Sequence, residues 1–251
     1  MCTFVVLRRP GHAWPLLVAA NRDESISRPW LPPARHWTDR AEVVAGQDLE
    51  AGGTWLGLND HGVVAGILNR RHSLGPAPDK RSRGELVLDA LDHADAAVAA
   101  EALAHLDGGA YRSFNMAIAD DRDAFWIRST GEGQPSVQPI PEGVSMLTAW
   151  DMNDEVASER TRFYLSRFRD APAPDPETGN WDAWETLLAS EETAPGVTDP
   201  NGAMRIVTDW GFATVSSSLI ALPALDGSGR RPIWRFATIW PQPGPYSPVE
   251  M

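Results

Sequence analysis

The chain has 251 residues, of which 43% are hydrophobic, and its 22 Lys and Arg against 34 Asp and Glu give a net charge of −12. This excess of negative charge repels phosphate backbones and anionic membrane surfaces, so we expect no nucleic-acid partner. Cys2 is the only cysteine, which excludes an intramolecular disulfide and a Cys-based zinc site.

No segment approaches the ~20 apolar residues of a membrane span, and the first apolar run does not have the pattern of a secretory leader. We therefore expect a cytoplasmic protein without membrane insertion, whose partner is a small-molecule ligand or substrate. The length suits one domain, which predicts a single domain over residues 1–251 with a Pro-rich C-terminal tail from about residue 241.

The first half of the chain contains two predicted hairpins. Residues 2–8 and 15–21 are apolar runs with β propensity on either side of a Pro-Gly turn, and residues 54–59 and 62–69 flank a second turn in the same way. Residues 22–40 between the hairpins are rich in Arg, Pro and Trp and have no period, which predicts a loop.

Helices are predicted between the hairpins. Ser82 followed by Glu85 has the pattern of a capping box, which indicates a helix over residues 82–93. Asp95 is expected to start the next helix. The further helices expected from apolar periodicity are residues 156–170 and 181–189.

Hairpins return in the second half, over residues 114–129 and 212–240, with a further strand over residues 144–150. Locally paired strands with helices between them imply antiparallel sheets with helices on their outer faces. This order predicts an α+β layered fold, and the sequence has neither of the glycine-rich motifs of nucleotide-binding folds.

Cys2 offers a specific chemistry if Met1 is removed. The residue would then carry a thiol and a free α-amine, whose reference pKa of ~7.7–8.0 suits a general base near neutral pH. An adjacent ammonium together with Arg22 is expected to favour the thiolate. The alternative interpretation is that Cys2 is a small apolar strand residue.

The segment Asn21-Arg22-Asp23-Glu24 ends the second predicted strand, so its side chains can return to the neighbourhood of Cys2. A carboxylate there could hold the α-ammonium while Arg22 compensates its charge. The alternative interpretation is an ordinary solvated turn.

These residues belong to an ordered series that is more specific than any one motif. The series consists of Met-Cys at the start, NRDE at 21–24, Ser-Arg-Pro at 27–29, GGTWLG at 52–57, GILN at 66–69, Phe-Asn at 114–115 before Ala-Asp at 119–120, and Ser-Ser-Ser at 216–218. It resembles the NRDE family, whose animal members are called transport and Golgi organisation protein 2. The resemblance implies an N-terminal-nucleophile (Ntn) fold, a four-layer αββα sandwich of two antiparallel sheets between helical layers, similar to penicillin V acylase and bile-salt hydrolase.

The resemblance also implies roles for single residues. In the related hydrolases a cysteine thiol attacks an amide carbonyl, its own amine moves the proton, and an Asp positions the amine. Cys2 takes the nucleophile and base position and Asp23 that of the orienting carboxylate. Asn69 and Asn115 are candidate oxyanion or substrate-positioning residues, or alternatively buried amides satisfied by the backbone.

The chain departs from the expected pattern at Ala20 and at Thr148-Ala149. The hydrolases carry an Arg three residues before the Asp, where this chain has Ala20, and Arg22 or Arg28 could replace it from another direction. Family members usually have Ser-Asn where this chain has Thr148-Ala149, which removes a polar side chain from the site.

The sequence thus predicts a thiol-dependent amidohydrolase acting on a small acyl-amide, with Arg28, Trp55, Ser216 and Ser217 as candidate substrate-binding residues. The alternative is a protein that carries haem or another apolar ligand on an Ntn scaffold. Among its 11 Trp, four lie near the N-terminal motifs and could line a flat apolar pocket. Four loop histidines, His12, His36, His61 and His72, could approach a haem iron. No cofactor other than a carried haem is expected, and no His pair has the spacing of a preformed metal site.

Overall fold

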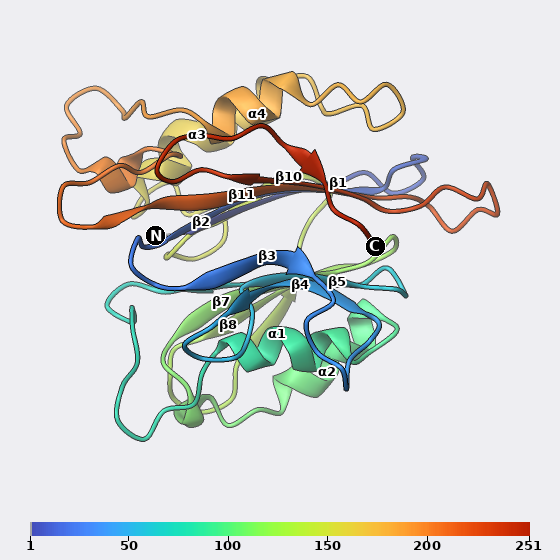
Figure 1. Ribbon diagram of the computed structural model, residues 1–251, viewed down its shortest axis with the longest axis horizontal. Coiled ribbons are helices and arrows are strands. Elements are labelled where there is room, and N and C mark those ends of the chain that lie inside the picture. Colours follow the sequence, from blue (N-terminus) through green and yellow to red (C-terminus); the bar gives the residue numbers. More distant parts are fainter. Residues whose placement is uncertain (1) are drawn as a thin grey trace. The chain divides into compact units, whose positions relative to one another are not determined.

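The computed structural model describes residues 2–251, which fold as two compact units. Unit 1 comprises residues 2–27 and 141–248, and unit 2 comprises residues 28–140 and 249–251. Each unit contains one antiparallel sheet, and two helices pack against it to form one hydrophobic core (Figure 1). The predicted α+β fold with antiparallel sheets is confirmed, and the single domain over residues 1–251 stays a prediction.

The sheet of unit 1 has six strands in the order β10-β1-β2-β11-β12-β13. They are β1 (Thr3–Arg8), β2 (Leu16–Ser25), β10 (Gly143–Leu147), β11 (Phe212–Leu222), β12 (Ile233–Thr238) and β13 (Ser247–Pro248). Thr3 lies opposite Asn21, and Asn21 lies opposite Ser217. The first and last predicted hairpins are confirmed, since β1 pairs with β2 and β11 with β12.

The helices of unit 1 are α3 (Glu159–Asp170) and α4 (Asp182–Leu188), with a short 3-10 turn η2 (Pro200–Gly202). Ser158 caps α3 by accepting a hydrogen bond from the Thr161 N–H at 3.1 Å, so the helix begins later than predicted. Phe168 of α3 meets Trp184 of α4 edge to face at 5.4 Å. These rings pack against the odd-numbered apolar residues of β2 and β11, which line one face of the sheet.

The sheet of unit 2 has seven strands, each paired with the next along the chain. They are β3 (Trp30–Ala34), β4 (Val43–Asp48), β5 (Leu56–Asn59), β6 (Val64–Asn69), β7 (Phe114–Ala119), β8 (Ala124–Ser129) and β9 (Ser136–Pro139). The hairpins β5–β6 and β7–β8 are confirmed.

The predicted loop over residues 22–40 is wrong in part, because β2 continues to Ser25 and β3 follows at Trp30. Pro32 and Pro33 lie in β3 where its register with β4 shifts. Proline is tolerated there because β3 is an edge strand, on which one row of N–H groups has no ladder partner to lose.

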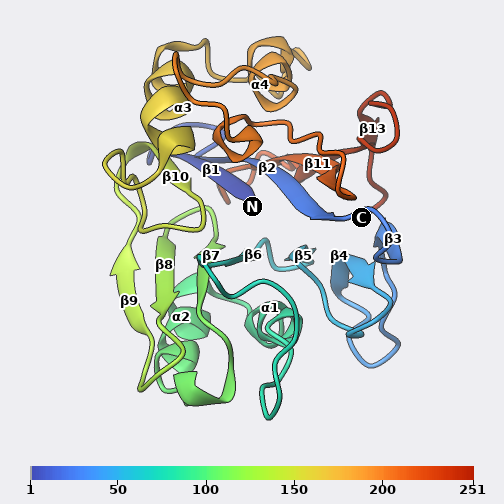
Figure 2. The ribbon, with the colours of Figure 1, turned by 90° about the vertical axis from the view of Figure 1, so that its left-hand side faces the viewer.

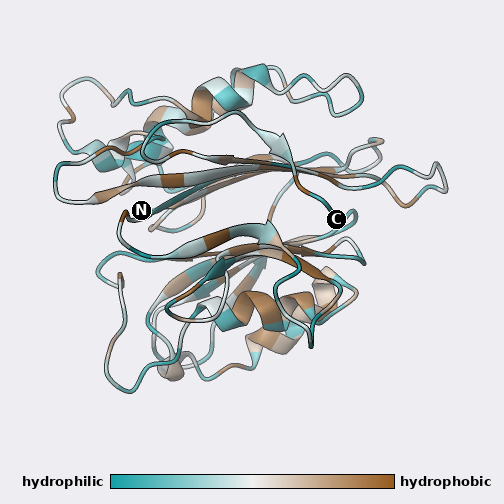
Figure 3. Cartoon of the chain, in the orientation of Figure 1, coloured by the Kyte–Doolittle hydropathy of each residue, from teal (hydrophilic) through white to brown (hydrophobic). Residues whose placement is uncertain are grey.

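The helices of unit 2 are α1 (Gly84–Leu91) and α2 (Ala96–Ala104), followed by the 3-10 turn η1 (Gly108–Ala110). Figure 2 shows both helices beside the strands of this unit, and Figure 3 shows apolar residues along them. Asp95 caps α2 as predicted, accepting from the Ala97 and Val98 N–H groups. None of the helices in residues 2–251 is long and apolar enough to cross a membrane.

The predicted capping box at Ser82 is wrong. The helix starts at Gly84, and the residue at its N-cap makes no side-chain cap. The start of α1 is instead held by backbone, because the Thr54 N–H donates to the Gly84 carbonyl at 3.1 Å. A Cβ on Gly53 would lie 2.5 Å from the Gly84 carbonyl carbon, so this close approach requires glycine.

Candidate active site

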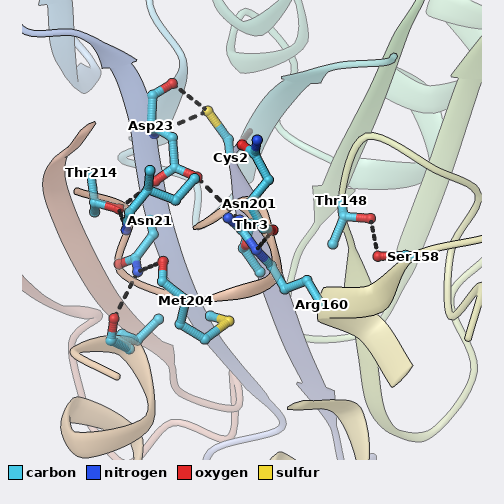
Figure 4. A network of polar contacts seen from close by, with 12 residues as sticks. Cys2, Thr3, Asn21, Asp23, Thr148, Ser158, Arg160, Asn201, Met204 and Thr214 are labelled. Carbon is cyan, nitrogen blue, oxygen red and sulfur yellow. Dashed lines mark hydrogen bonds and ion pairs between the residues drawn. The ribbon is translucent and has the colours of Figure 1, made fainter. Parts of the chain in front are cut away.

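The Cys2 thiol lies against the backbone of Asp23. Cys2 is half-buried and directly precedes β1. Its Sγ accepts a hydrogen bond from the Asp23 N–H at 3.4 Å and donates to the Asp23 carbonyl oxygen at 3.5 Å (Figure 4). The pairing of β1 with β2 thus brings the start of the chain to the end of the NRDE segment.

The Asp23 carboxylate is fully buried and held through both oxygens. Oδ1 accepts from the Thr214 hydroxyl at 2.6 Å, and Oδ2 accepts from Arg160 Nη1 at 3.1 Å. Thr214 lies opposite Asp23 in the β2–β11 register and itself accepts from the Ile206 N–H at 2.8 Å. Because both oxygens are engaged by fixed donors, the carboxylate has one orientation.

Arg160 is a site residue that the sequence analysis missed. It lies in the first turn of α3 with only 4% of its side chain exposed. Its Nη1 also donates to the Thr3 hydroxyl, and its Nε donates to the Asn201 carbonyl at 3.2 Å. The signal that could have revealed it is the spacing to Tyr164 and Phe168, which places a charged residue on the apolar stripe of the helix.

Asn21 begins the NRDE segment and serves the scaffold. Its Nδ2 donates to the carbonyl oxygens of Leu188 at 2.9 Å and Met204 at 3.0 Å. Leu188 is the last residue of α4, so Asn21 ties the sheet to the end of that helix. Its Oδ1 is buried with no hydrogen-bond partner among residues 2–251.

The surroundings of Cys2 favour the protonated thiol in the chain that carries Met1. Burial of the thiol and the negative charge of Asp23 raise its pKa, and Glu24 adds to this effect. The α-ammonium of the chain and the Asp23 backbone hydrogen bond act in the opposite direction but are outweighed. The expected preference for thiolate concerns the chain from which Met1 has been removed, and it stays a prediction.

Three other predicted residues lie in unit 1. Arg22 is buried and lies opposite Ser216. Ser217 lies opposite Asn21, and its hydroxyl accepts from the Tyr246 hydroxyl at 2.6 Å. Neighbouring residues of a strand point to opposite faces, so Ser216 and Ser217 do not line the same surface. Their roles stay predictions.

The two predicted asparagines of unit 2 are placed differently. Asn115 is fully buried, and its Oδ1 accepts from Arg70 Nη1 at 2.8 Å and Trp126 Nε1 at 3.1 Å. Asn69 lies opposite Phe114, which packs in the core under α1 and α2. Asn69 and Asn115 therefore project from opposite faces of their sheet.

The remaining two predicted residues also make contacts within unit 2. Arg28 pairs with Asp48 at 2.6 Å and Glu50 at 2.8 Å. Trp55 meets Trp30 edge to face at 5.8 Å. Its ring also lies over Gly46, where a Cβ would come within 2.3 Å of it.

The tryptophans near the N-terminal motifs divide between the two units. Trp14 is part of the core of unit 1, and its Nε1 donates to Glu177 at 3.0 Å. Trp37 donates from Nε1 to the Gly52 carbonyl in unit 2. Over residues 2–251, no group of three or more His, Cys, Asp and Glu side chains could hold a metal ion.

Comparison with known proteins matches the chain to one family. The family model described as Transport and Golgi organisation 2 matches residues 1–171. The Transport and Golgi organization 2 homologs of Mus musculus and Homo sapiens are each 37% identical to the chain over 114 residues. That segment is 43% of this chain and 40% of each relative, so the match spans less than half the length of these relatives.

Solved structures with the same fold are hydrolases by name. A Caenorhabditis elegans N-acylethanolamine-hydrolyzing acid amidase ortholog has a TM-score of 0.58 at 14% identity, covering 90% of this chain and 94% of that one. Penicillin V acylase from Agrobacterium tumefaciens has a TM-score of 0.57 at 13% identity, covering 95% and 83%. The C2A mutant of conjugated bile acid hydrolase from Clostridium perfringens has a TM-score of 0.56 at 12% identity, covering 100% and 92%. At such identities these similarities show the fold alone.

Proposed function

The chain belongs to the Transport and Golgi organisation 2 family and has the N-terminal-nucleophile hydrolase fold, and from this premise we propose that it is an N-terminal-cysteine amidohydrolase acting on a small acyl-amide. The observation that carries the proposal is the contact of Cys2 Sγ with the Asp23 peptide group, beside a carboxylate fixed through both oxygens. A structural cysteine needs no such neighbour.

The proposed reaction begins once Met1 has been removed. The Cys2 α-amine takes the thiol proton, and Sγ attacks the carbonyl carbon of the amide. The C–N bond then breaks, the leaving amine takes the proton from the α-ammonium, and an acyl thioester remains on Cys2. Water, deprotonated by the same α-amine, hydrolyses the thioester and releases the carboxylic acid.

Asp23 acts here as the negative partner of the α-ammonium, and its backbone N–H donates to the sulfur. The roles of Asn69 and Asn115 as oxyanion donors stay predictions.

The test compares wild type with Cys2→Ala, and intact mass first establishes that Met1 has been removed. We expect the processed wild type to hydrolyse at least one of a panel of acyl-amides of increasing chain length, and Cys2→Ala to hydrolyse none. Asp23→Asn should fold and lose most of the turnover, because a neutral amide is a weaker partner for the ammonium. Retention of Met1 in the native protein would contradict the mechanism.

The alternative, a carrier of haem or another apolar ligand, makes the opposite prediction for the same variants. A carrier has no reacting carbonyl, so its binding should survive Cys2→Ala and weaken in Trp55→Ala, which breaks the Trp30–Trp55 pair. Saturable haem binding with this pattern, together with no hydrolysis of any amide, would favour the carrier.

A further inference from the structure

Arg160 makes contacts that the proposed reaction does not by itself require. We propose that Arg160 is a positioning residue that balances the charge of the Asp23 carboxylate and holds it in register with Cys2. The inference rests on the proposed function, because it assigns Arg160 to the same reaction.

The first argument is geometric. One nitrogen of Arg160, Nη1, contacts both the Asp23 carboxylate and the hydroxyl of Thr3, the residue that follows Cys2. Its Nε holds the Asn201 carbonyl at the same time. A single guanidinium from α3 therefore joins the start of β1 to the carboxylate on β2, and its planar fork suits such divided contacts.

The second argument is electrostatic. The side chains of Asp23 and Arg160 are 0% and 4% exposed, so water screens the pair little. Without a cation, the buried carboxylate would favour the protonated forms of the Cys2 thiol and α-amine, both of which must lose a proton for the reaction. The positive charge of Arg160 reduces this effect.

Charged groups near Cys2 come from strand β2 and from helix α3. Strand β2 contributes Arg22, Asp23 and Glu24, and α3 contributes Arg160. Strands β10 and β11 contain no charged residue. Asp199 at the start of η2 binds the Asn201 N–H through its carboxylate. Arg160 is therefore a cation that contacts Asp23 from outside the strand of Asp23.

The experiment measures the pH dependence of Cys2 alkylation by iodoacetamide, followed by intact mass between pH 6 and 10. Cys2 is the only cysteine, so the label reports on it alone. We expect the midpoint to rise by about one pH unit in Arg160→Met and to stay near wild type in Arg160→Lys, which keeps the charge. The matched control is Arg162→Met on the same helix, where an exposed Arg pairs with Glu159, and it should change nothing.

A second background tests whether Arg160 acts through Asp23. In Asp23→Asn there is no carboxylate charge for Arg160 to balance or hold in place, so adding Arg160→Met should raise the midpoint by less than it does in the wild-type background. An equal rise in both backgrounds, or no rise in either, would overturn the inference.

Folding and turnover keep the test decisive. Circular dichroism shows whether Arg160→Met folds, and Arg160→Lys decides the test if it does not. An ammonium cannot replace the three divided contacts of the guanidinium, so we expect Arg160→Lys to lose amide turnover about tenfold while its alkylation midpoint stays unchanged. Full turnover in Arg160→Lys would overturn the positioning role. If the alkylation midpoint shifts but no amide is hydrolysed, the charge coupling between Arg160 and Cys2 stands and the proposed function is rejected. If amides are hydrolysed but the alkylation midpoint does not move, only the inference about Arg160 is rejected.

Discussion

Two buried asparagines, one in each unit, donate hydrogen bonds to carbonyl groups at the C-terminal end of a helix. In unit 2, Asn59 at the end of β5 donates from Nδ2 to the carbonyl oxygens of Leu91 and His93, where α1 ends, at 2.8 and 2.7 Å. In unit 1, Asn21 of β2 donates from Nδ2 to the carbonyl of Leu188, where α4 ends, at 2.9 Å. The last carbonyls of a helix lack intrahelical partners, so a strand amide is a suitable donor for them.

The difference between the two sites lies in what surrounds the amide. The oxygen of Asn59 accepts from the His61 and Val63 N–H groups, so its carbonyl and amide groups are all bonded. The Asn21 oxygen is buried without a partner in the described part of the chain, and Asp23 follows two residues later with its buried ion pair. Groups that are costly to bury persist where they serve a function, which supports a purely structural role for the site in unit 2 and a chemical one for unit 1.

Breaking the Asp23–Arg160 pair should have the largest effect on stability. Arg160→Met leaves a buried carboxylate without its cation, and we expect the free energy of unfolding to fall by about 3–5 kcal/mol. Urea denaturation followed by circular dichroism measures the loss. Asp23→Asn combined with Arg160→Met should recover part of it, and a loss under about 1 kcal/mol in the single variant would contradict the contrast between the units.

The two asparagines should respond unequally to alanine. Asn59→Ala leaves two carbonyls and two N–H groups unsatisfied, and we expect a loss of about 3 kcal/mol. Asn21→Ala removes the two hydrogen bonds of Nδ2, but it also removes a buried oxygen that has no partner within the described residues. We therefore expect the free energy of unfolding to fall by only about 1–2 kcal/mol. Thermal melts of both variants measured side by side check the order, and a larger loss for Asn21→Ala would reverse it.

A residue that stays attached before Cys2 should keep the pKa of the Cys2 thiol higher than it is after Met1 removal. Burial and Asp23 raise the pKa of the thiol in the chain that carries Met1, so its reactive thiolate forms only at higher pH. Removal of Met1 moves the ammonium onto Cys2 itself, and the alkylation midpoint should then fall by about one pH unit, which corresponds to about 1.4 kcal/mol. A chain with an extra, uncleaved N-terminal residue serves as the reference. Equal midpoints would show that the amine does not act on the thiol.

A surface ion pair of unit 2 should matter least. Arg40 pairs with Asp92 at 2.9 Å, but their side chains are 25% and 44% exposed and water screens them. We expect Arg40→Met to lower the free energy of unfolding by about 0.5 kcal/mol in the same urea assay. A loss as large as that of Arg160→Met would remove the distinction between the buried pair and the surface pair.

The sequence by itself determined the elements whose signals are local. The first hairpin follows from two β-type runs around a Pro-Gly turn, and its pairing places Asn21 of the NRDE segment opposite Thr3, the residue after Cys2. The start of α2 follows from Asp95, whose side chain caps the next N–H groups. The ordered motifs from Cys2 to the serines of β11 indicated the family and the Ntn fold, because such a series constrains the whole chain.

Only the tertiary structure decided the partners of Asp23. Arg160 and Thr214 are separated from it by 137 and 191 residues, and no local pattern encodes which distant strand or helix lies beside β2. The register shift between Thr214 and Ser216 likewise places Thr214 opposite Asp23, since one added residue inverts the alternation of a strand. Buried polar groups take the partners that packing brings within hydrogen-bond distance, and in this protein packing draws those partners from strands and a helix far apart in the sequence.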